Sequence, residues 1–159
     1  MLNENIIIGQ ALNERIKSGK TTLLDNLLIA LANFTTGLFP DITTYIGAQS
    51  QGAETPSIWI DCYDLNTQRK LGSTDRHDFG AEITYWPEDQ AANTEITNVV
   101  FMIADSLNTV SHTENIFTCY TKESDITDNV GHVVCNFYAY QQTIADDPLI
   151  RIADKELNT

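Results

Sequence analysis

Ser73, His77 and Asp78 bring together the three residue types of a hydrolase triad, namely a hydroxyl, an imidazole and a carboxylate. In such a triad the imidazole takes a proton from the hydroxyl, while the carboxylate holds the imidazole in the right orientation. No nucleophile-elbow motif surrounds Ser73, although that sharp turn is what exposes a serine in many hydrolases. The sequence therefore argues against a hydrolase.

The same stretch is the densest polar cluster of the chain, because Asp75 and Arg76 precede His77 and Asp78. A metal site needs ligands that converge, but adjacent residues of a strand point to opposite faces. We therefore expect a solvated start of a strand here and no metal site. His112 and His132 are isolated and are expected to be surface or interface residues, and the scattered carboxylates define no catalytic pair. The sequence predicts no catalytic residue and no cofactor.

Ser18-Gly19-Lys20-Thr21-Thr22 resembles the end of a phosphate-binding loop. The full motif begins with a glycine five residues before the second one, so that backbone N–H groups can surround the phosphate. Glu14 occupies that position and would place a carboxylate against the phosphate. We reject a nucleotide site and instead predict a helix N-cap at Thr22, with Asp25 in the capping-box position.

The chain contains three cysteines, Cys62, Cys119 and Cys135, without C-x-x-C spacing. Each falls in a predicted strand, so we expect reduced, mostly buried thiols in a reducing compartment. The sequence shows neither a signal peptide nor an apolar run of transmembrane length, and we expect a soluble protein made in the cytoplasm.

The chain is acidic, with 22 acidic residues against nine basic ones among its 159 residues and a formal net charge of −13. Nucleic-acid binding through phosphates requires clustered Lys and Arg, so this charge argues against it, and also against binding to an anionic membrane. The charge is compatible with a surface past which nucleic acid slides, or simply with a device for solubility.

Apolar periodicity predicts helices over about 22–37 and 92–107 and a short strand over 43–46. Residues 57–63 and 77–86 alternate like two strands of a large hairpin, joined by a polar connector over 64–76. Two further strands are expected over 116–122 and 130–142, joined by a polar turn at 123–129. The predicted fold is α+β: a single domain with a mostly antiparallel sheet of about five strands and two main helices packed on one face.

We expect this domain to span residues 20–142, between an N-terminal arm (1–19) and a C-terminal tail (143–159). The arm contains Arg15 and Lys17 on an amphipathic segment and could dock on a neighbouring subunit, or it could be a partly disordered terminus.

The order and character of these elements resemble those of the phage tail terminator family. Four segments carry the resemblance: the first helix ending in Leu38-Phe39-Pro40-Asp41-Ile42, the strand start Thr55-Pro56-Ser57-Ile58-Trp59-Ile60, the stretch from Arg69-Lys70-Leu71-Gly72 through Arg76-His77-Asp78-Phe79 to Ile83-Thr84-Tyr85-Trp86-Pro87, and the last strand from Gly131 to Tyr140. The resemblance covers about residues 20–142.

This resemblance implies a structural virion protein that forms a homo-oligomeric ring, a hexamer, on the last ring of tail-tube protein. Such a ring stops tube polymerisation and presents a head-attachment surface to head-completion proteins. DNA would pass through it without specific binding, repelled by carboxylates that line the channel. The protein would reside in the tail or neck of the virion after assembly in the host cytoplasm. The alternatives are another neck, connector or head-completion protein, the cap of a phage-derived contractile particle, or a small ligand-binding domain or enzyme.

Contacts with neighbouring subunits or partners are expected at the connector 64–76 and at the loop 47–55, because loops of this length are often functional. The candidate residues are Trp59, Tyr63, Asn66, Gln68, Arg69, Lys70 and Arg76, together with Arg15 and Lys17 of the arm. Trp59 and Tyr63 lie on the less apolar face of their strand and could anchor an interface, or a helix could bury them.

Overall fold

The computed structural model describes residues 2–47 and 53–142. The elements follow the order β1 (Ile6–Ile8), α1 (Gln10–Ser18), α2 (Leu23–Leu38), β2 (Thr43–Ile46), β3 (Ser57–Arg69), β4 (Thr74–Trp86), α3 (Asn93–Ser106), β5 (Thr109–His112), β6 (Asn115–Thr127) and β7 (Val130–Gln142). The predicted loop 47–55 lies partly outside the described residues, and the predicted tail 143–159 lies wholly outside them.

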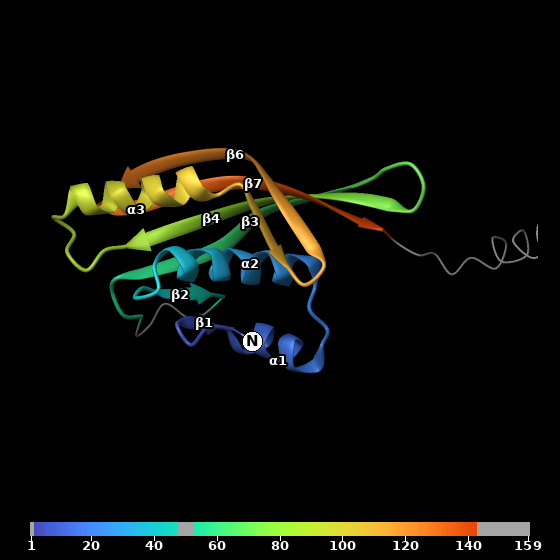
Figure 1. Ribbon diagram of the computed structural model, residues 1–159, viewed down its shortest axis with the longest axis horizontal. Helices are drawn as coiled ribbons and strands as arrows, with labels where there is room; N and C mark the ends of the chain where they lie inside the picture. The colour runs from blue at the N-terminus through green and yellow to red at the C-terminus, as the bar shows by residue number, and fades with distance from the viewer. Residues whose placement is uncertain (1, 48–52, 143–159) are drawn as a thin grey trace, which may run out of the picture.

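In the described part of the chain, seven strands form one sheet in the order β1-β2-β3-β4-β7-β6-β5 (Figure 1). The pairs β1/β2 and β2/β3 are parallel, and the other four pairs are antiparallel. The sheet curls into a half-barrel and is accompanied by three helices. The prediction of a mostly antiparallel sheet of about five strands with two helices is therefore wrong.

The missing strands are short, and their sequences contain no clear periodicity. The third helix, α1, lies in the N-terminal arm, on the segment that was expected to be amphipathic. Strand β1 consists of three consecutive isoleucines, which show no alternation, and β5 has only four residues. β1 joins the sheet by pairing in parallel with β2, with Ile7 opposite Tyr45. Parallel pairing of this kind is set by tertiary packing between distant segments, and a single short run of sequence does not reveal it.

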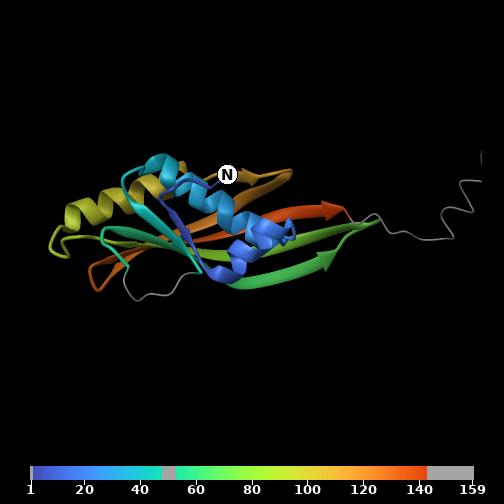
Figure 2. The ribbon, with the colours of Figure 1, turned by 90° about the horizontal axis from the view of Figure 1, so that it is seen from below.

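The helices α2 and α3 cover one face of the sheet (Figure 1, Figure 2). Leu27 and Leu31 of α2 and Ile96 and Ile103 of α3 are fully buried against it, as the predicted apolar stripes require. The predicted capping box is present: Thr22 Oγ1 accepts from Asp25 N (3.1 Å), and Asp25 Oδ2 accepts from Thr22 N (2.9 Å).

The sheet has one buried face and one face turned away from α2 and α3. The buried face presents apolar side chains such as Ile60, Ile83 and Phe137 to the helices. Alternation places the neighbouring residues on the opposite side, which we call the open face. It includes Trp59, Asp61, Asn66, Gln68, Arg76, Asp78, Glu82, Thr84, His132, Val134, Asn136, Tyr138 and Tyr140.

The segment 64–76, predicted as a connector loop, is mostly strand. β3 continues to Arg69 and β4 begins at Thr74, so only residues 70–73 turn the chain. The resulting β3–β4 hairpin extends beyond α2 and α3 (Figure 1, Figure 2). Its outer part has no helix above it, so both faces meet water and the sequence there lacks apolar alternation.

Two β-bulges interrupt the long strands at matching Cys-Tyr pairs. The register of β3 shifts between Cys62 and Asp64, and that of β6 shifts between Cys119 and Thr121. Each cysteine thiol donates to the carbonyl two residues later, at 3.3 Å from Cys62 and 3.4 Å from Cys119. Bulges bend and twist a strand, so this pair helps the sheet to curl.

The polar turn predicted at 123–129 is much shorter in the structure. β6 runs to Thr127, and Asp128 and Asn129 alone turn the chain, with φ angles of 52° and 60°. Two consecutive positive φ angles are typical of the two-residue turns that match the twist of a hairpin.

Candidate functional site

The polar cluster at the start of β4 does not form a triad. His77 Nδ1 lies 2.8 Å from Thr67 Oγ1, and Asp78 is held by Arg76 instead of by the imidazole. His77 pairs with Thr67 and Asp78 pairs with Asn66, so the two side chains leave opposite faces of the hairpin. Within residues 2–47 and 53–142, no group of three His, Cys, Asp or Glu side chains is arranged to hold a metal ion.

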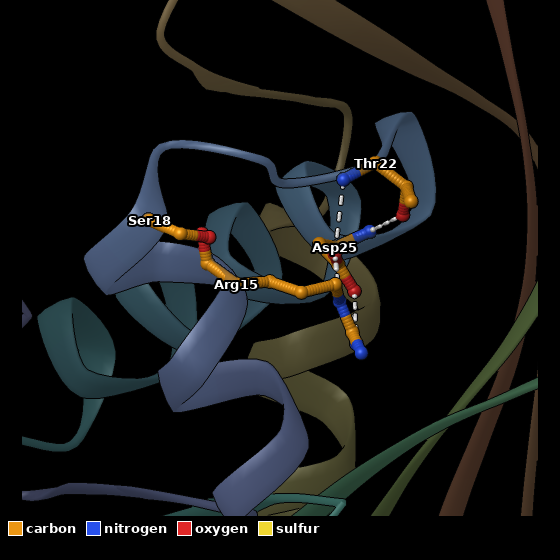
Figure 3. Close-up of polar contacts among 4 residues, drawn as sticks. All are labelled: Arg15, Ser18, Thr22 and Asp25. Atoms are coloured by element: carbon orange, nitrogen blue, oxygen red, sulfur yellow. Dashed lines mark hydrogen bonds and ion pairs between the residues drawn. The ribbon is translucent and has the colours of Figure 1, made fainter.

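The segment that resembles a phosphate-binding loop connects two helices. Gly19 ends α1 with a φ of 68°, a left-handed conformation that glycine adopts without strain. Arg15 donates from Nε and an Nη atom to the two oxygens of Asp25, at 2.7 and 2.8 Å (Figure 3). Glu14 lies within α1. Arg15 of α1 therefore ties this helix to the N-terminus of α2.

Asp25 is strongly held at this junction. Its side chain is almost fully buried, and burial alone would raise the pKa of its carboxyl. Hydrogen bonds from Arg15 and Thr22 outweigh burial and lower the pKa below its ordinary value of 3.8. Arg15, one of the predicted interface residues, thus has an internal partner, whereas Lys17 is exposed on the same helix.

Four predicted interface residues lie in the outer part of the β3–β4 hairpin. Asn66 is paired with Asp78 and Gln68 with Arg76 on the open face. Arg69 donates to Asp75 at 3.2 Å, and Lys70 Nζ donates to Gln68 at 3.1 Å. Beyond them, at the turn, the side chain of Leu71 is 98% exposed.

Arg76 is fixed on the open face by its neighbours. Its guanidinium makes a bidentate contact with Asp78, at 2.9 and 3.2 Å, and lies 4.5 Å from the ring centroid of Tyr138. The ring centroid of Tyr120 lies 6.0 Å from the same guanidinium. A guanidinium stacked on aromatic rings and paired with a carboxylate is held in one orientation, as protein interfaces often require.

The two predicted aromatic anchors also lie on the side of the sheet away from α2 and α3. Trp59 stacks on Tyr45, with ring centroids 4.5 Å apart and an interplanar angle of 11°, and its Nε1 donates to Ser57 Oγ. Tyr63, at the β3 bulge, lies over Gly80 and donates to Asn136 Oδ1 at 3.3 Å. Tyr63 is 54% exposed, so a large part of its ring meets solvent.

A hollow of about 520 Å³ opens beside Trp59 on the same face. Its walls include Asp61, Glu82, His132 and Trp86. His132 Nδ1 lies 2.7 Å from a carboxylate oxygen of Glu82. The pKa of Asp61 is raised, first by the partial burial of its own carboxyl and second by the negative charge of Glu82. Asp61 is paired directly with Glu82 across the strands, and a like-charge pair of this kind is costly unless a partner compensates it.

Sequence reasoning missed the arrangement that joins these residues. It did not predict that Tyr120, Tyr138 and Asn136 would lie beside Tyr63 and Arg76. The repeated Cys-Tyr pair at 62–63 and 119–120 is the signal that could have revealed it, because both tyrosines stand at bulges of strands that flank the central pair β4/β7.

None of the helices in the described ranges is long and apolar enough to cross a membrane. Among curated proteins, none matches the chain with significance. A sequence profile of the family described as "Phage tail terminator protein" matches residues 23–148, which is most of the chain and includes both helices of the buried face and the whole β3–β4 hairpin. The chain therefore belongs to the phage tail terminator family and is a structural protein of the virion tail.

Proposed function

We propose that copies of this chain close into a ring, a hexamer, on the end of the tail tube. The ring stops polymerisation of the tube and gives the head-completion proteins a surface to bind. The mechanism is steric: the ring occupies the growing end of the tube and replaces it with a different surface.

The observation that carries the proposal is the β3–β4 hairpin. It extends past the two helices that cover the core, and residues 63–73 along it are all exposed. An ordered hairpin of this kind adds little to the burial of its own core, but it can reach a neighbouring molecule. The fixed Arg76 and the exposed tyrosines on the open face supply groups that are frequent at protein interfaces.

The distribution of charge supports passage of DNA without binding. Between His77 and Thr121 the chain contains no Lys or Arg, and the whole chain has a net charge of −13. Proteins that hold DNA through its phosphates need clustered cations. In the proposed ring, carboxylates that face the channel repel the DNA backbone and keep it mobile.

The test combines purified protein with tail tubes. Mass photometry of the protein alone and with tubes should reveal a single ring-sized species, and electron microscopy should show it at one end of each tube. Tube protein that polymerises in its presence should give shorter tubes. A persistent monomer that leaves tube ends bare and tube lengths unchanged contradicts the proposal.

A shortened variant supplies the control. Replacing residues 66–78 by Asn-Gly joins Leu65 to Phe79, which are already paired, through a two-residue turn. The helices and the buried face stay intact, so circular dichroism and cooperative unfolding should be retained. The shortened protein should no longer cap tubes. If it caps them as well as the full chain does, the hairpin does not carry the function.

A further inference from the structure

A shallow apolar groove lies between α3 and the end of β6. These two elements lie side by side at the end of the molecule away from the tip of the β3–β4 hairpin (Figure 1, Figure 2). Its volume is about 500 Å³, and Val100, Phe101, Ala104 and Ile126 line it. Phe101 is 64% exposed although it belongs to the helix that covers the core. Phe101 and Ile126, which is 38% exposed, both line the groove, so it offers apolar surface that a side chain of another molecule can cover.

The tip of the β3–β4 hairpin projects from the molecule, whereas the α3–β6 groove is recessed. Leu71 is 98% exposed and projects from a four-residue turn, 70–73, at the far end of the two long strands. Gly72 follows it with a φ of 76°, which holds the turn in a conformation that favours glycine. The groove and the tip lie at opposite ends of one copy, so a contact between them has to form between two copies.

The charges at the two ends are complementary. Arg69 and Lys70 immediately precede Leu71 at the tip. At the groove, Asp125 is part of the lining, and Asp105 lies on α3 four residues after Phe101, hence beside it on the helix surface. Lys122 is the one cation of the sequence between His77 and Leu149, so the surroundings of the groove are predominantly acidic.

We propose that the tip of one copy docks in the α3–β6 groove of the next, with Leu71 against Phe101 and with Arg69 and Lys70 facing Asp105 and Asp125. This contact rests on the proposed ring and specifies how its subunits join. It is head-to-tail, because each copy offers a tip to one neighbour and a groove to the other. Head-to-tail contacts close into rings when the rotation between copies permits it.

Charge reversal tests the contact at both ends. The tip variant R69E/K70E and the groove variant D105K/D125K should each weaken ring formation at least tenfold by mass photometry across a dilution series. A chain with all four substitutions should form rings again, and so should an equimolar mixture of the two variants. In the mixture, an acidic tip meets a basic groove and a basic tip meets an acidic groove, so both contacts become attractive.

The controls separate this contact from general effects of charge and folding. E4K/D41K makes the same change in net charge as the groove variant at two exposed sites away from the groove, and it should leave ring formation unchanged. L71D adds a charge to the tip and should weaken assembly as strongly as R69E/K70E. Recovery in the four-substitution chain also demonstrates that the substituted residues do not prevent folding.

The possible outcomes show whether the proposed contact or the proposed function is wrong. If the wild type forms rings and caps tubes while the tip and groove variants behave like it, the contact is wrong and the proposed function stands. If each variant fails and neither the combined chain nor the mixture recovers, the pairing of tip with groove is also overturned. If the wild type itself forms no ring and binds no tube end, the proposed function is contradicted, and so is the contact that rests on it.

Discussion

The ring of Tyr63 lies over Gly80, so that a Cβ at position 80 would stand 2.5 Å from the ring carbon Cζ. Tyr63 occupies the β3 bulge, and Gly80 is the residue of β4 opposite Asp64. The missing side chain at position 80 thus makes room for the tyrosine, which reaches across β4 to Asn136 of β7. Three neighbouring strands are joined by this one contact.

Gly80→Ala should displace the ring and break the hydrogen bond from Tyr63 to Asn136, at a cost of about 1 kcal/mol. In a Tyr63→Ala background the same substitution should be neutral or should stabilise by about 0.4–1 kcal/mol, because alanine restricts the unfolded chain. Urea unfolding of the wild type, the two single variants and the double variant measures the coupling energy between positions 63 and 80. An equal effect of Gly80→Ala in both backgrounds contradicts the contact.

A second glycine makes room for a helix. A Cβ at Gly131 of β7 would collide with Val100 of α3. Gly131→Ala should destabilise by about 1–3 kcal/mol, since it overpacks the interface between helix and sheet. The cost should fall in a Val100→Ala background. Gly37→Ala is the control: no atom within 4 Å would meet its Cβ, and it should stabilise α2 by about 0.5–1 kcal/mol.

The capping box gives a prediction at the start of α2. Thr22→Ala removes the oxygen that accepts from Asp25 N and should cost about 1 kcal/mol in the free energy of unfolding. Thr21→Ala changes the adjacent residue of the same type without removing the cap and should have a much smaller effect. Thermal unfolding of both variants provides the comparison, and equal losses would mean that Thr22 does not act as the cap.

The carboxyl of Asp25 makes stability depend on pH. Its pKa is lowered in the folded protein, so the native state binds fewer protons and the resulting stability is present above the ordinary value of 3.8. This contribution is lost as the pH falls through the folded value. Asp25→Asn should therefore be less stable than the wild type at pH 7, and the difference should shrink below pH 3.8. A difference that stays constant between pH 7 and pH 3 rules out this account.

The three thiols should differ in reactivity. Cys135 is buried, and burial raises its pKa to about 12, so almost none of it is thiolate at neutral pH. Cys62 and Cys119 are only partly buried. Iodoacetamide at pH 8 should modify Cys62 and Cys119 before Cys135, and all three should react at similar rates in urea. Mass spectrometry of the peptides measures the order.

The sequence predicted the helices and strands that bury one face over several helical turns or several strand residues. The stripes of α2 and α3 locate both helices within one residue at each end, and β2 has the predicted bounds. These segments pack against the sheet, so burial imposes a regular apolar spacing on them. The capping box at Thr22 was predicted from side-chain chemistry alone.

The sequence did not predict the parts of the long strands whose side chains are exposed. From Asp64 to Arg69 and from Glu123 to Thr127 every residue is exposed and most are polar, so burial imposes no apolar alternation on them, although Asp125 and Ile126 border α3. The pattern was therefore interpreted as a connector and a turn. The candidate residues Asn66, Gln68, Arg69 and Lys70 still lie together at the outer part of the hairpin. Asn66, Gln68 and Arg69 belong to a strand paired with β4, however, and not to a loop.

The role of the hairpin in contacts stays a prediction, and so does that of Trp59, Tyr63 and Lys17. Their neighbours could not be inferred from sequence, since the stacking of Trp59 on Tyr45 depends on the parallel pairing of β2 with β3. The tie between Arg15 and Asp25 likewise joins two helices whose relative placement no local pattern fixes.

The continuity of β4 has a mechanical consequence. One uninterrupted strand leads from Thr74 near the tip to Trp86 at the other end of the molecule, and it pairs on both sides along most of that length. A flexible loop would hold a bound partner at a distance without fixing its orientation, whereas this hairpin behaves as a stiff cantilever anchored in the middle of the sheet. A load applied at the tip is shared by many backbone hydrogen bonds in shear, so whatever holds the tip also fixes the orientation of the entire subunit.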